Sequence, residues 1–470
     1  MNDKHSSTDP KRKKYRWRWG PKLPKHLDQI NHNAAGIDVG ARKHYVAVPE
    51  DRDEHPVQVF EPFTPDLIEM VQWLKQCGID TVVMESTGVY WIPLFQVLQD
   101  HGFEVLLVDA RHVKYVPGRK TDVFDCQWLQ QLHTFGLLRG AFVPDKDIAA
   151  LRTYSRQRKQ LVQSCSREIQ HMQKALTQMN LQLPVVISDI TGVTGMRIIR
   201  AIVAGERDPV VLAKMKHPGV KSSEETIVKA LSGNYRHEHV FTLTQALDLY
   251  DIYQGKIAQC DQALARRMQA FEVKADPKEL AAKPSKRNKR KRRKNEPHFD
   301  LRAELYQMTG VDLTQIDGID AMTALSIITE CGFDMQRFPT EKHFASWLGL
   351  CPNNTVTGGK VKKTRSRNVH NRAAQALRIA AQSLHSSTTY LGAHYRRMHA
   401  RLGAPKALTA TAHKLGRLVY HMLKYGQDYV DKGQQYEEEQ YRKRAERNLR
   451  RRAHAMGYQL ICVDTGEILA

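Results

Sequence analysis

Four carboxylates in the first third of the chain have types and positions that suit divalent-metal chemistry. Asp38 lies inside an apolar run, where a charge is costly unless it is paired or binds a cation. Glu85 ends another apolar run, and Asp122 and Asp125 are three residues apart, so on a helix both project from one side. Adjacent carboxylates repel one another unless a divalent cation lies between them. We therefore predict that the four bind one or two Mg²⁺ (or Mn²⁺) ions, as in-line phosphodiester displacement requires.

A hydroxyl beside two glycines is a second candidate for chemistry. Thr357 precedes Gly358 and Gly359, whose missing side chains would let a phosphate approach closely. The same residues are also typical of an ordinary turn, and the sequence alone leaves that alternative open. Basic residues that could contact the phosphates of a nucleic acid follow at Lys360, Lys362, Lys363, Arg365, Arg367 and Arg372.

Hydrophobic periodicity indicates which elements must position the carboxylates. We expect helices at 66–77, 94–99 and 122–138, and strands at 35–39, 45–48, 57–60, 81–84 and 105–108. The resulting order βββαβαβα is that of the α/β ribonuclease-H-like fold, a mixed sheet with helices on both faces. In that fold the first strand, the fourth strand and the last helix converge at one end, which would bring the four carboxylates together.

The rest of the chain divides by composition. A basic tail with interleaved Trp and Tyr residues should be disordered and suited to phosphate contact and base stacking, or only solubilising. Within the helical region, residues 147–180 read as one long helix whose apolar stripe would pack either inside the chain or against a second copy. The expected segments are 1–33 (basic tail), 34–146 (catalytic domain), 147–275 (helical, coiled-coil region), 276–298 (basic linker), 299–430 (mainly α C-terminal domain) and 431–470 (basic helical tail).

A glycine turn in the C-terminal domain offers another phosphate contact. Gly318 lies in Ile316-Asp-Gly-Ile-Asp-Ala-Met, which is similar to the hairpin of helix-hairpin-helix modules. There, backbone N–H groups of the turn bind a phosphate. An ordinary turn before a helix is the alternative.

The charge of the chain indicates a polyanionic partner. The formal net charge is +22, and residues 342–427 contain no Asp or Glu but fifteen Lys and Arg. Basic side chains that meet phosphates release condensed counterions, which favours nucleic acid as the partner. The chain has no apolar run of about 18 residues and no secretory signal, so we expect a cytoplasmic protein with no membrane segment. Its seven scattered cysteines suggest reduced thiols.

Two sets of motifs resemble one known family. They are Gly-Ile-Asp38-Val-Gly, Met-Glu85-Ser-Thr-Gly-Val-Tyr-Trp and Gly-Arg-Lys-Thr-Asp122-Val-Phe-Asp125, followed by Trp347-Leu-Gly-Leu-Cys-Pro and Thr357-Gly-Gly-Lys. Across residues 34–430 the chain resembles the DEDD transposases of bacterial insertion sequences, the IS one-ten family. The resemblance implies a RuvC-like catalytic domain, a coiled-coil linker and a C-terminal transposase domain that supplies a serine nucleophile. It also implies recombination guided by a structured RNA that binds donor and target DNA.

The resemblance assigns roles to particular residues. Asp38, Glu85, Asp122 and Asp125 would bind Mg²⁺, and the family's serine falls on Thr357. Threonine keeps the hydroxyl but adds a methyl group, so Ser346 and Ser366 remain alternatives.

Together these features favour a transposase that cuts and rejoins DNA by phosphodiester transesterification. We expect a dimer or tetramer acting at the bacterial nucleoid. The alternatives are a RuvC-like junction endonuclease that uses water, and a non-catalytic nucleic-acid-binding protein.

Overall fold

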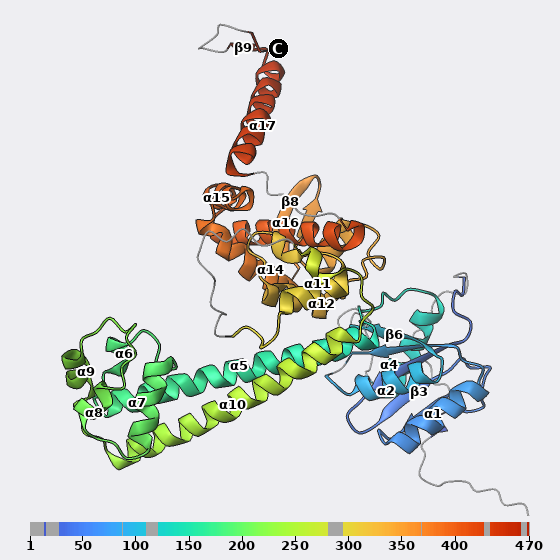
Figure 1. Cartoon of the computed structure of the whole chain (residues 1–470). Helices are drawn as coiled ribbons and strands as arrows, with labels where there is room; N and C mark the ends of the chain where they lie inside the picture. Colours follow the sequence, from blue (N-terminus) through green and yellow to red (C-terminus); the bar gives the residue numbers. More distant parts are fainter. Residues whose placement is uncertain are drawn as a thin grey trace, which may run out of the picture. The chain divides into compact units, whose positions relative to one another are not determined.

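The protein is described by a computed structural model and forms two compact units, residues 1–143 and 144–470 (Figure 1). The structure describes residues 14–15, 28–86, 88–109, 121–280, 295–367, 369–426, 433–461 and 468–469. Most of the expected basic tail (1–33) and basic linker (276–298) lies outside these ranges.

The first unit contains one mixed sheet with the order β1-β4-β3-β2-β5-β6. Strands β2, β5 and β6 are parallel, whereas β3 and β4 continue the sheet from β2 in antiparallel fashion, and β1 pairs with β4. The strands are β1 (Lys14–Tyr15), β2 (Ala34–Val39), β3 (His44–Ala47), β4 (Val57–Phe60), β5 (Thr81–Glu85) and β6 (Glu104–Val108). The five expected strands are confirmed, each to within one residue at either end.

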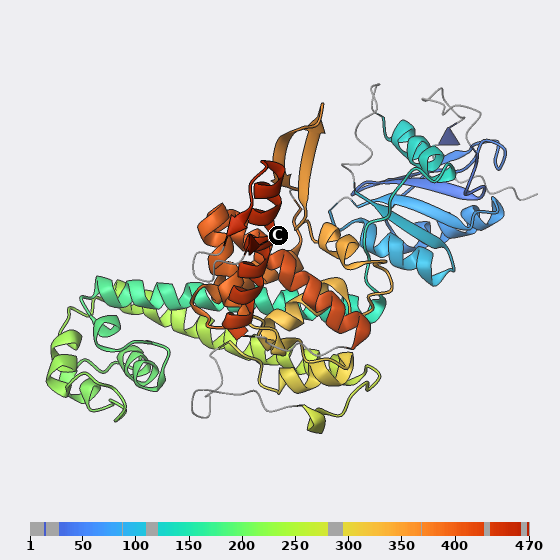
Figure 2. The ribbon, with the colours of Figure 1, turned by 90° about the horizontal axis from the view of Figure 1, so that it is seen from above.

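Helices cover both faces of this sheet, as Figure 2 shows. Helices α1 (Thr64–Gln76) and α2 (Trp91–Asp100) pack on one face, where Leu74 and Leu94 share a core with Ile37 and Met84. Helix α4 (Asp122–Thr134) packs on the other face, where Leu129 meets Val83. Alternate residues of a strand point to opposite faces, so β2 and β5 each contribute to both cores.

The second unit begins with two helices of 33 residues, α5 (Lys146–Gln178) and α10 (His237–Gln269), that pack side by side. They run antiparallel, because Arg158 pairs with Asp261 while Gln254 Nε2 lies 3.3 Å from Cys165 Sγ. Both Figure 1 and Figure 2 show this long pair, with four short helices at its far end. These are α6 (Leu183–Val186), α7 (Val193–Val203), α8 (Pro209–Ala213) and α9 (Glu224–Leu231).

The apolar stripe of the long helix packs inside the chain. Cys165, Met172 and Leu176 are buried in one core with Leu243 and Leu247 of α10. The stripe is thus covered by the chain's own second helix, so it gives no support to a homo-oligomer. The alternative that this stripe packs against a second copy of the chain is therefore wrong.

The C-terminal part of this unit is mainly helical, as expected. Helix α16 lies at its centre, where the buried hydroxyl of Tyr420 donates to the carbonyl oxygen of Phe338 at 2.9 Å. The helices are α11 (Leu301–Thr309), α12 (Ala321–Cys331), α13 (Glu341–Trp347), α14 (Arg372–Ser383), α15 (Tyr390–Leu402), α16 (Ala404–Tyr425) and α17 (Gly433–Ala455), with 3-10 turns at Pro277–Glu279, Leu313–Gln315 and Leu384–Ser386.

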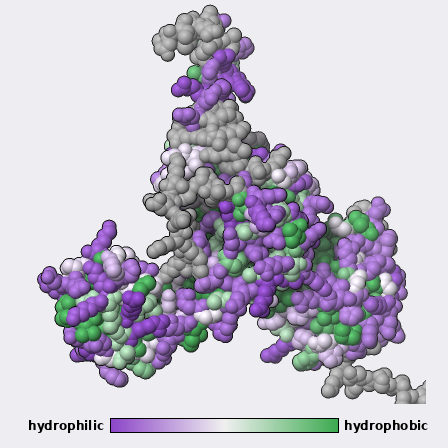
Figure 3. Space-filling view, in the orientation of Figure 1, coloured by the Kyte–Doolittle hydropathy of each residue, from purple (hydrophilic) through white to green (hydrophobic). Residues whose placement is uncertain are grey.

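Short strands complete the unit. An antiparallel hairpin, β7 (Pro352–Thr357) and β8 (Lys360–Ser366), interrupts the helices, and β9 (Leu460–Ile461) pairs with β10 (Ile468–Leu469). Helix α17 has a hydrophilic surface (Figure 3), in line with the expected basic helical tail. No helix in the described ranges is both long and apolar enough to cross a membrane.

Candidate active site

Two of the four carboxylates lie at the ends of neighbouring parallel strands. In the register of β2 and β5, Ile37 pairs with Met84, and the next residues along the two strands are Asp38 and Glu85. Neighbouring strands are about 5 Å apart, so the two carboxylates start from adjacent backbone positions. Both side chains are partly buried. Strand alternation turns them toward the face that α4 covers.

Helix α4 approaches this face with its backbone directly on β2. A Cβ atom on Gly36 would lie closer than 3.0 Å to the backbone of Cys126 and of Gln130. Further along, Gln130 Nε2 donates to the carbonyl oxygen of Ala34 at 3.3 Å. Later residues of α4 therefore meet earlier residues of β2, so the first turn of α4 extends toward the end of β2 that carries Asp38.

The first turn of α4 carries the other two carboxylates. Asp122 is exposed and Asp125 is partly buried. The helix begins after Thr121, whose hydroxyl accepts a hydrogen bond from the amide of Phe124 at 3.4 Å. Acidic side chains in this turn also complement the positive end of the helix dipole.

The negative charges of Asp38 and Asp125 both affect the buried thiol of Cys126. Burial raises the pKa of Cys126 well above its ordinary value, and the negative charges of Asp38 and Asp125 raise it further. Two carboxylates from different elements therefore lie within electrostatic reach of one sulfur atom. This agrees with the convergence that the strand register indicates.

The described side chains do not form a closed metal site. Within the ranges that the structure covers, no group of three or more His, Cys, Asp or Glu side chains is arranged to hold a metal ion. The residue types do fit one, because carboxylate oxygens are the ligands that Mg²⁺ and Mn²⁺ prefer. The backbone thus brings Asp38, Glu85, Asp122 and Asp125 toward one edge, while their side chains are not gathered around a common point.

The opposite end of α4 is fastened by residues that the sequence did not single out. His133 Nε2 and Thr81 Oγ1 are 2.8 Å apart, which links α4 to the start of β5. Burial lowers the pKa of His133 to about 4, although Asp80 opposes the shift. Gly36 was also missed, although a glycine inside a strand often marks a close backbone approach.

Thr357 lies at the tip of the β7–β8 hairpin. It pairs with Lys360 across a two-residue turn, in which Gly358 and Gly359 have φ angles of 57° and 73°. Positive φ at both central residues defines a type I′ turn, so the glycines have a backbone reason to be there. The turn itself was left open as an alternative, but the hairpin was not expected. Thr357 is exposed, as are Lys360 and Lys362; the side chains of Lys363 and Arg365 lie outside the described part.

Two other expected nucleic-acid contacts have structural partners. Arg367 Nη2 donates to Ser346 Oγ at 2.9 Å and to the Ser346 carbonyl oxygen, which ties the end of the hairpin to α13. Gly318 has a φ of 85°, and a Cβ atom there would lie 2.6 Å from the carbonyl oxygen of Ala380. Close packing against α14 therefore accounts for this glycine, and its contact with phosphate stays a prediction.

Arg372 is the first residue of α14 and is exposed. It borders a cleft rather than the hairpin. The hairpin and the four carboxylates belong to different compact units.

Comparison with known families assigns the class. A family model described as a transposase, of the IS110 type, matches residues 35–181. A second model, described as "Transposase IS116/IS110/IS902 family", matches residues 312–396. No curated protein matches the chain. The first match runs from β2 to the end of α5, and the second spans the hairpin, so together they define a transposase.

The chain belongs to the IS110 family of insertion-sequence transposases. Transposases of this family generally cut and rejoin DNA, and the chain shares this general activity. DNA is therefore the substrate.

Proposed function

We propose that the protein cuts and rejoins DNA by transesterification, with a ribonuclease-H-like (RuvC-like) catalytic domain in the first unit and a hydroxyl nucleophile, Thr357, in the second. The observation that carries the proposal is the placement of Asp38 and Glu85 at adjacent strand ends, facing the first turn of α4. The mixed sheet with helices on both faces supports the fold assignment.

Asp38, Glu85, Asp122 and Asp125 would hold Mg²⁺ or Mn²⁺. When bound, the cation would polarise the scissile phosphate and stabilise the charge that develops on it. The carboxylates themselves repel a phosphate, so their role would be to hold the cation at one edge of the sheet. Because α4 sits on the strand through Gly36, their backbone positions are set by packing rather than by loops.

The covalent step belongs to Thr357. Its Oγ would attack phosphorus while the P–O bond to the leaving strand breaks, the hydroxyl proton passes to solvent and the leaving oxygen takes up a proton. A hydroxyl of the new strand then attacks the phosphothreonine and releases Thr357. One phosphodiester is broken and one is formed, so rejoining needs no external energy source. The exposed tip of a hairpin suits a residue that must reach a large substrate.

The partners would be donor and target DNA, together with a structured guide RNA. The RNA is what the family resemblance implies, and the 86-residue stretch without acids (342–427) supports extensive contact with nucleic acid. We also propose that two or more copies (a dimer or tetramer) assemble the complete site, as the notion of a composite site with its nucleophile and carboxylates in different units suggests. This would take place in the bacterial cytoplasm, at the nucleoid.

The test is capture of the covalent intermediate. Labelled element DNA, the element's RNA and Mg²⁺ are incubated with the full chain and separated on denaturing gels. We expect a protein–DNA band with the unaltered protein and with Thr357→Ser, and none with Thr357→Ala. Thr355→Ala is the matched control, because it removes an exposed hydroxyl from the same strand.

Asp38→Asn combined with Asp122→Asn should also abolish the band. If Thr357→Ala releases cleaved ends at the normal rate, water is the nucleophile and the protein is a junction-type endonuclease. If the Asp38/Asp122 variant recombines DNA normally, the proposed catalytic site is wrong.

A further inference from the structure

Three helices of the second unit enclose a polar cleft that no motif or family assignment explains. It lies between α5, α12 and α14 and has a volume of about 210 Å³. This is far more than the roughly 15 Å³ that one water molecule requires. Uncharged donors line it from each helix, including Ser155, Thr323 and Gln375.

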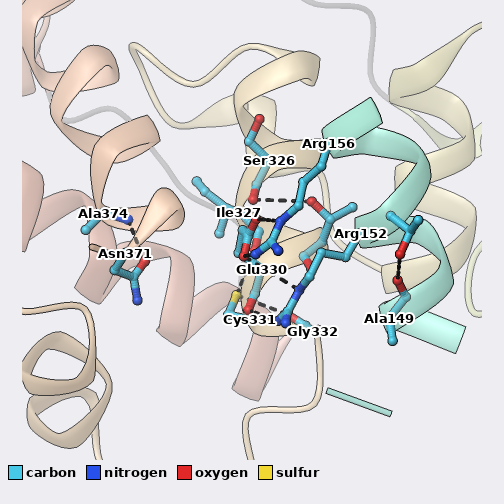
Figure 4. Close-up of polar contacts among 12 residues, drawn as sticks. Ala149, Arg152, Arg156, Ser326, Ile327, Glu330, Cys331, Gly332, Asn371 and Ala374 are labelled. Carbon is cyan, nitrogen blue, oxygen red and sulfur yellow. Dashed lines mark hydrogen bonds and ion pairs between the residues drawn. The ribbon is translucent and has the colours of Figure 1, made fainter. Parts of the chain in front are cut away.

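The acidic side chains of the cleft are already engaged. Glu330 accepts hydrogen bonds from Arg156 Nε at 2.9 Å and from Nη2 at 2.6 Å, and its side chain is only 11% exposed. Arg152 adds bonds to the carbonyl oxygens of Thr329 and Glu330, at 3.0 and 2.7 Å. Figure 4 shows Arg152 and Arg156 reaching Glu330 on α12. Asp320 accepts from the amide and the hydroxyl of Thr323, at 2.9 and 2.8 Å.

The basic side chains outnumber these acids. Three basic side chains line the cleft: Arg156, Lys159 and Arg372. Arg152 lies behind it and pairs with Glu330. The acids of the cleft are Glu330 and Asp320. Lys159 and Arg372 are exposed, and neither has an ion pair or hydrogen bond within the described ranges of the chain. Burial lowers the pKa of Arg152; Glu330 opposes this shift, while Arg156 and Arg372 add to it. The cleft therefore has an excess of positive charge.

Two helices also begin at the cleft. Asp320 caps the start of α12, and Arg372 is the first residue of α14. Helix N-termini carry partial positive charge, which favours anions. The carboxylate of Asp320 offsets this charge at α12, whereas the cap of α14 is the neutral Asn371, which accepts a hydrogen bond from the amide of Ala374 at 3.0 Å. The cleft thus combines cations from two helices with the positive end of α14.

We propose that the cleft between α5, α12 and α14 binds a backbone phosphate of nucleic acid, with Lys159 and Arg372 as its two charged contacts. Arg152 and Arg156 share the single carboxylate of Glu330, so this cluster keeps one positive charge beside the two contacts. The inference rests on the proposed function only in taking nucleic acid as the partner. It adds a contact on α5, a helix that no expected nucleic-acid contact includes.

The test measures binding as a function of salt, in EDTA so that no cleavage occurs. The ligands are a labelled 30-base-pair DNA duplex and a labelled RNA stem-loop. The double variant Lys159→Gln with Arg372→Gln is compared with Lys174→Gln. Lys174 is an exposed lysine on the same helix, about 22 Å further along.

Each lost phosphate contact should reduce the slope of log K against log salt by about 0.9. Because the two side chains contact one phosphate, we expect the double variant to lower the slope by about 0.9 on at least one ligand. The ligand affected identifies the source of the phosphate as DNA or RNA. Lys174→Gln should leave the slope unchanged, and Lys159→Arg should preserve it. Thermal melting of each variant confirms that the fold is intact.

A double variant that matches Lys174→Gln on both ligands would overturn the proposal. Loss of affinity without a change in slope would do the same, because phosphate contacts must release counterions. Neither result depends on catalysis, so failure here is distinct from failure of the Thr357 or carboxylate tests.

Discussion

The close approach of α4 to β2 at Gly36 can be tested with one methyl group. In Gly36→Ala the new Cβ atom would lie closer than 3.0 Å to backbone atoms of Cys126 and Gln130. Backbone atoms cannot rotate away as a side chain would. Helix α4 must therefore retreat from β2 by about 1 Å to restore an ordinary carbon contact.

The retreat should affect stability and activity together. Forcing extra volume into a packed interior costs about 1–3 kcal/mol, which corresponds to a fall of roughly 4–12 °C in the melting temperature of a unit of this size. Asp122 and Asp125 ride on the first turn of the same helix. A displacement of about 1 Å at a catalytic group lowers the rate by roughly 10²-fold.

The assay combines melting curves with the rate of covalent DNA adduct formation, measured well below the transition. Gly255→Ala is the matched control, because Gly255 is an exposed glycine within α10 whose Cβ would meet nothing within 4 Å. It should leave activity unchanged and raise stability by about 0.5–1 kcal/mol. Normal melting and normal activity in Gly36→Ala would refute the packing argument. A destabilised but fully active variant would show that α4 does not position catalytic groups.

Three further outcomes are expected. Arg158→Met should lower the free energy of unfolding by about 3–5 kcal/mol in denaturant, because it leaves the carboxylate of Asp261 buried without its charge partner. Adding Asp261→Leu should recover most of the lost stability. An equal loss of stability in the single and double variants would count against the ion pair. Because burial lowers the pKa of His133 to about 4, below the value of about 6.5 in an unfolded chain, the neutral ring stabilises the fold fully above pH 6.5 and less as the pH falls toward 4. His133→Gln should flatten the melting temperature between pH 6.5 and 5, and an unchanged profile would contradict this. Gly358→Val should raise the rate of proteolysis within 352–366 about 5- to 30-fold, because a β-branched residue at a φ of 57° costs about 1–2 kcal/mol. Gly358→Asn suits the turn and should leave the rate unchanged. Equal rates of proteolysis for the two variants would argue against a type I′ turn.

The strands of the first unit were predictable because each is a short apolar run between turn residues. The sheet positions of Asp38 and Glu85 followed from that order. The convergence of their side chains did not, because like charges repel and only a cation between them would favour it. The sequence therefore predicts the backbone positions of the carboxylates and not the positions of their oxygen atoms.

Long-range pairing limited the prediction of the second unit. The stripe on residues 147–180 was evident, but its partner begins 59 residues after α5 ends, at His237. The hairpin was missed for a different reason: β7 is exposed along its whole length, so no apolar alternation marks it. Gly358 and Gly359 were noted for their lack of side chains, whereas the structure uses their positive φ angles.

The antiparallel pairing of α5 and α10 makes the length of that pair adjustable. Helix α5 starts and α10 ends at one base, where Arg267 pairs with Asp147, and the four short helices lie at the other end. Removing two heptads from each helix would draw those short helices about 21 Å toward the base, while keeping the same faces in contact. The length of the pair could therefore be changed in whole heptads without touching the four carboxylates or Thr357.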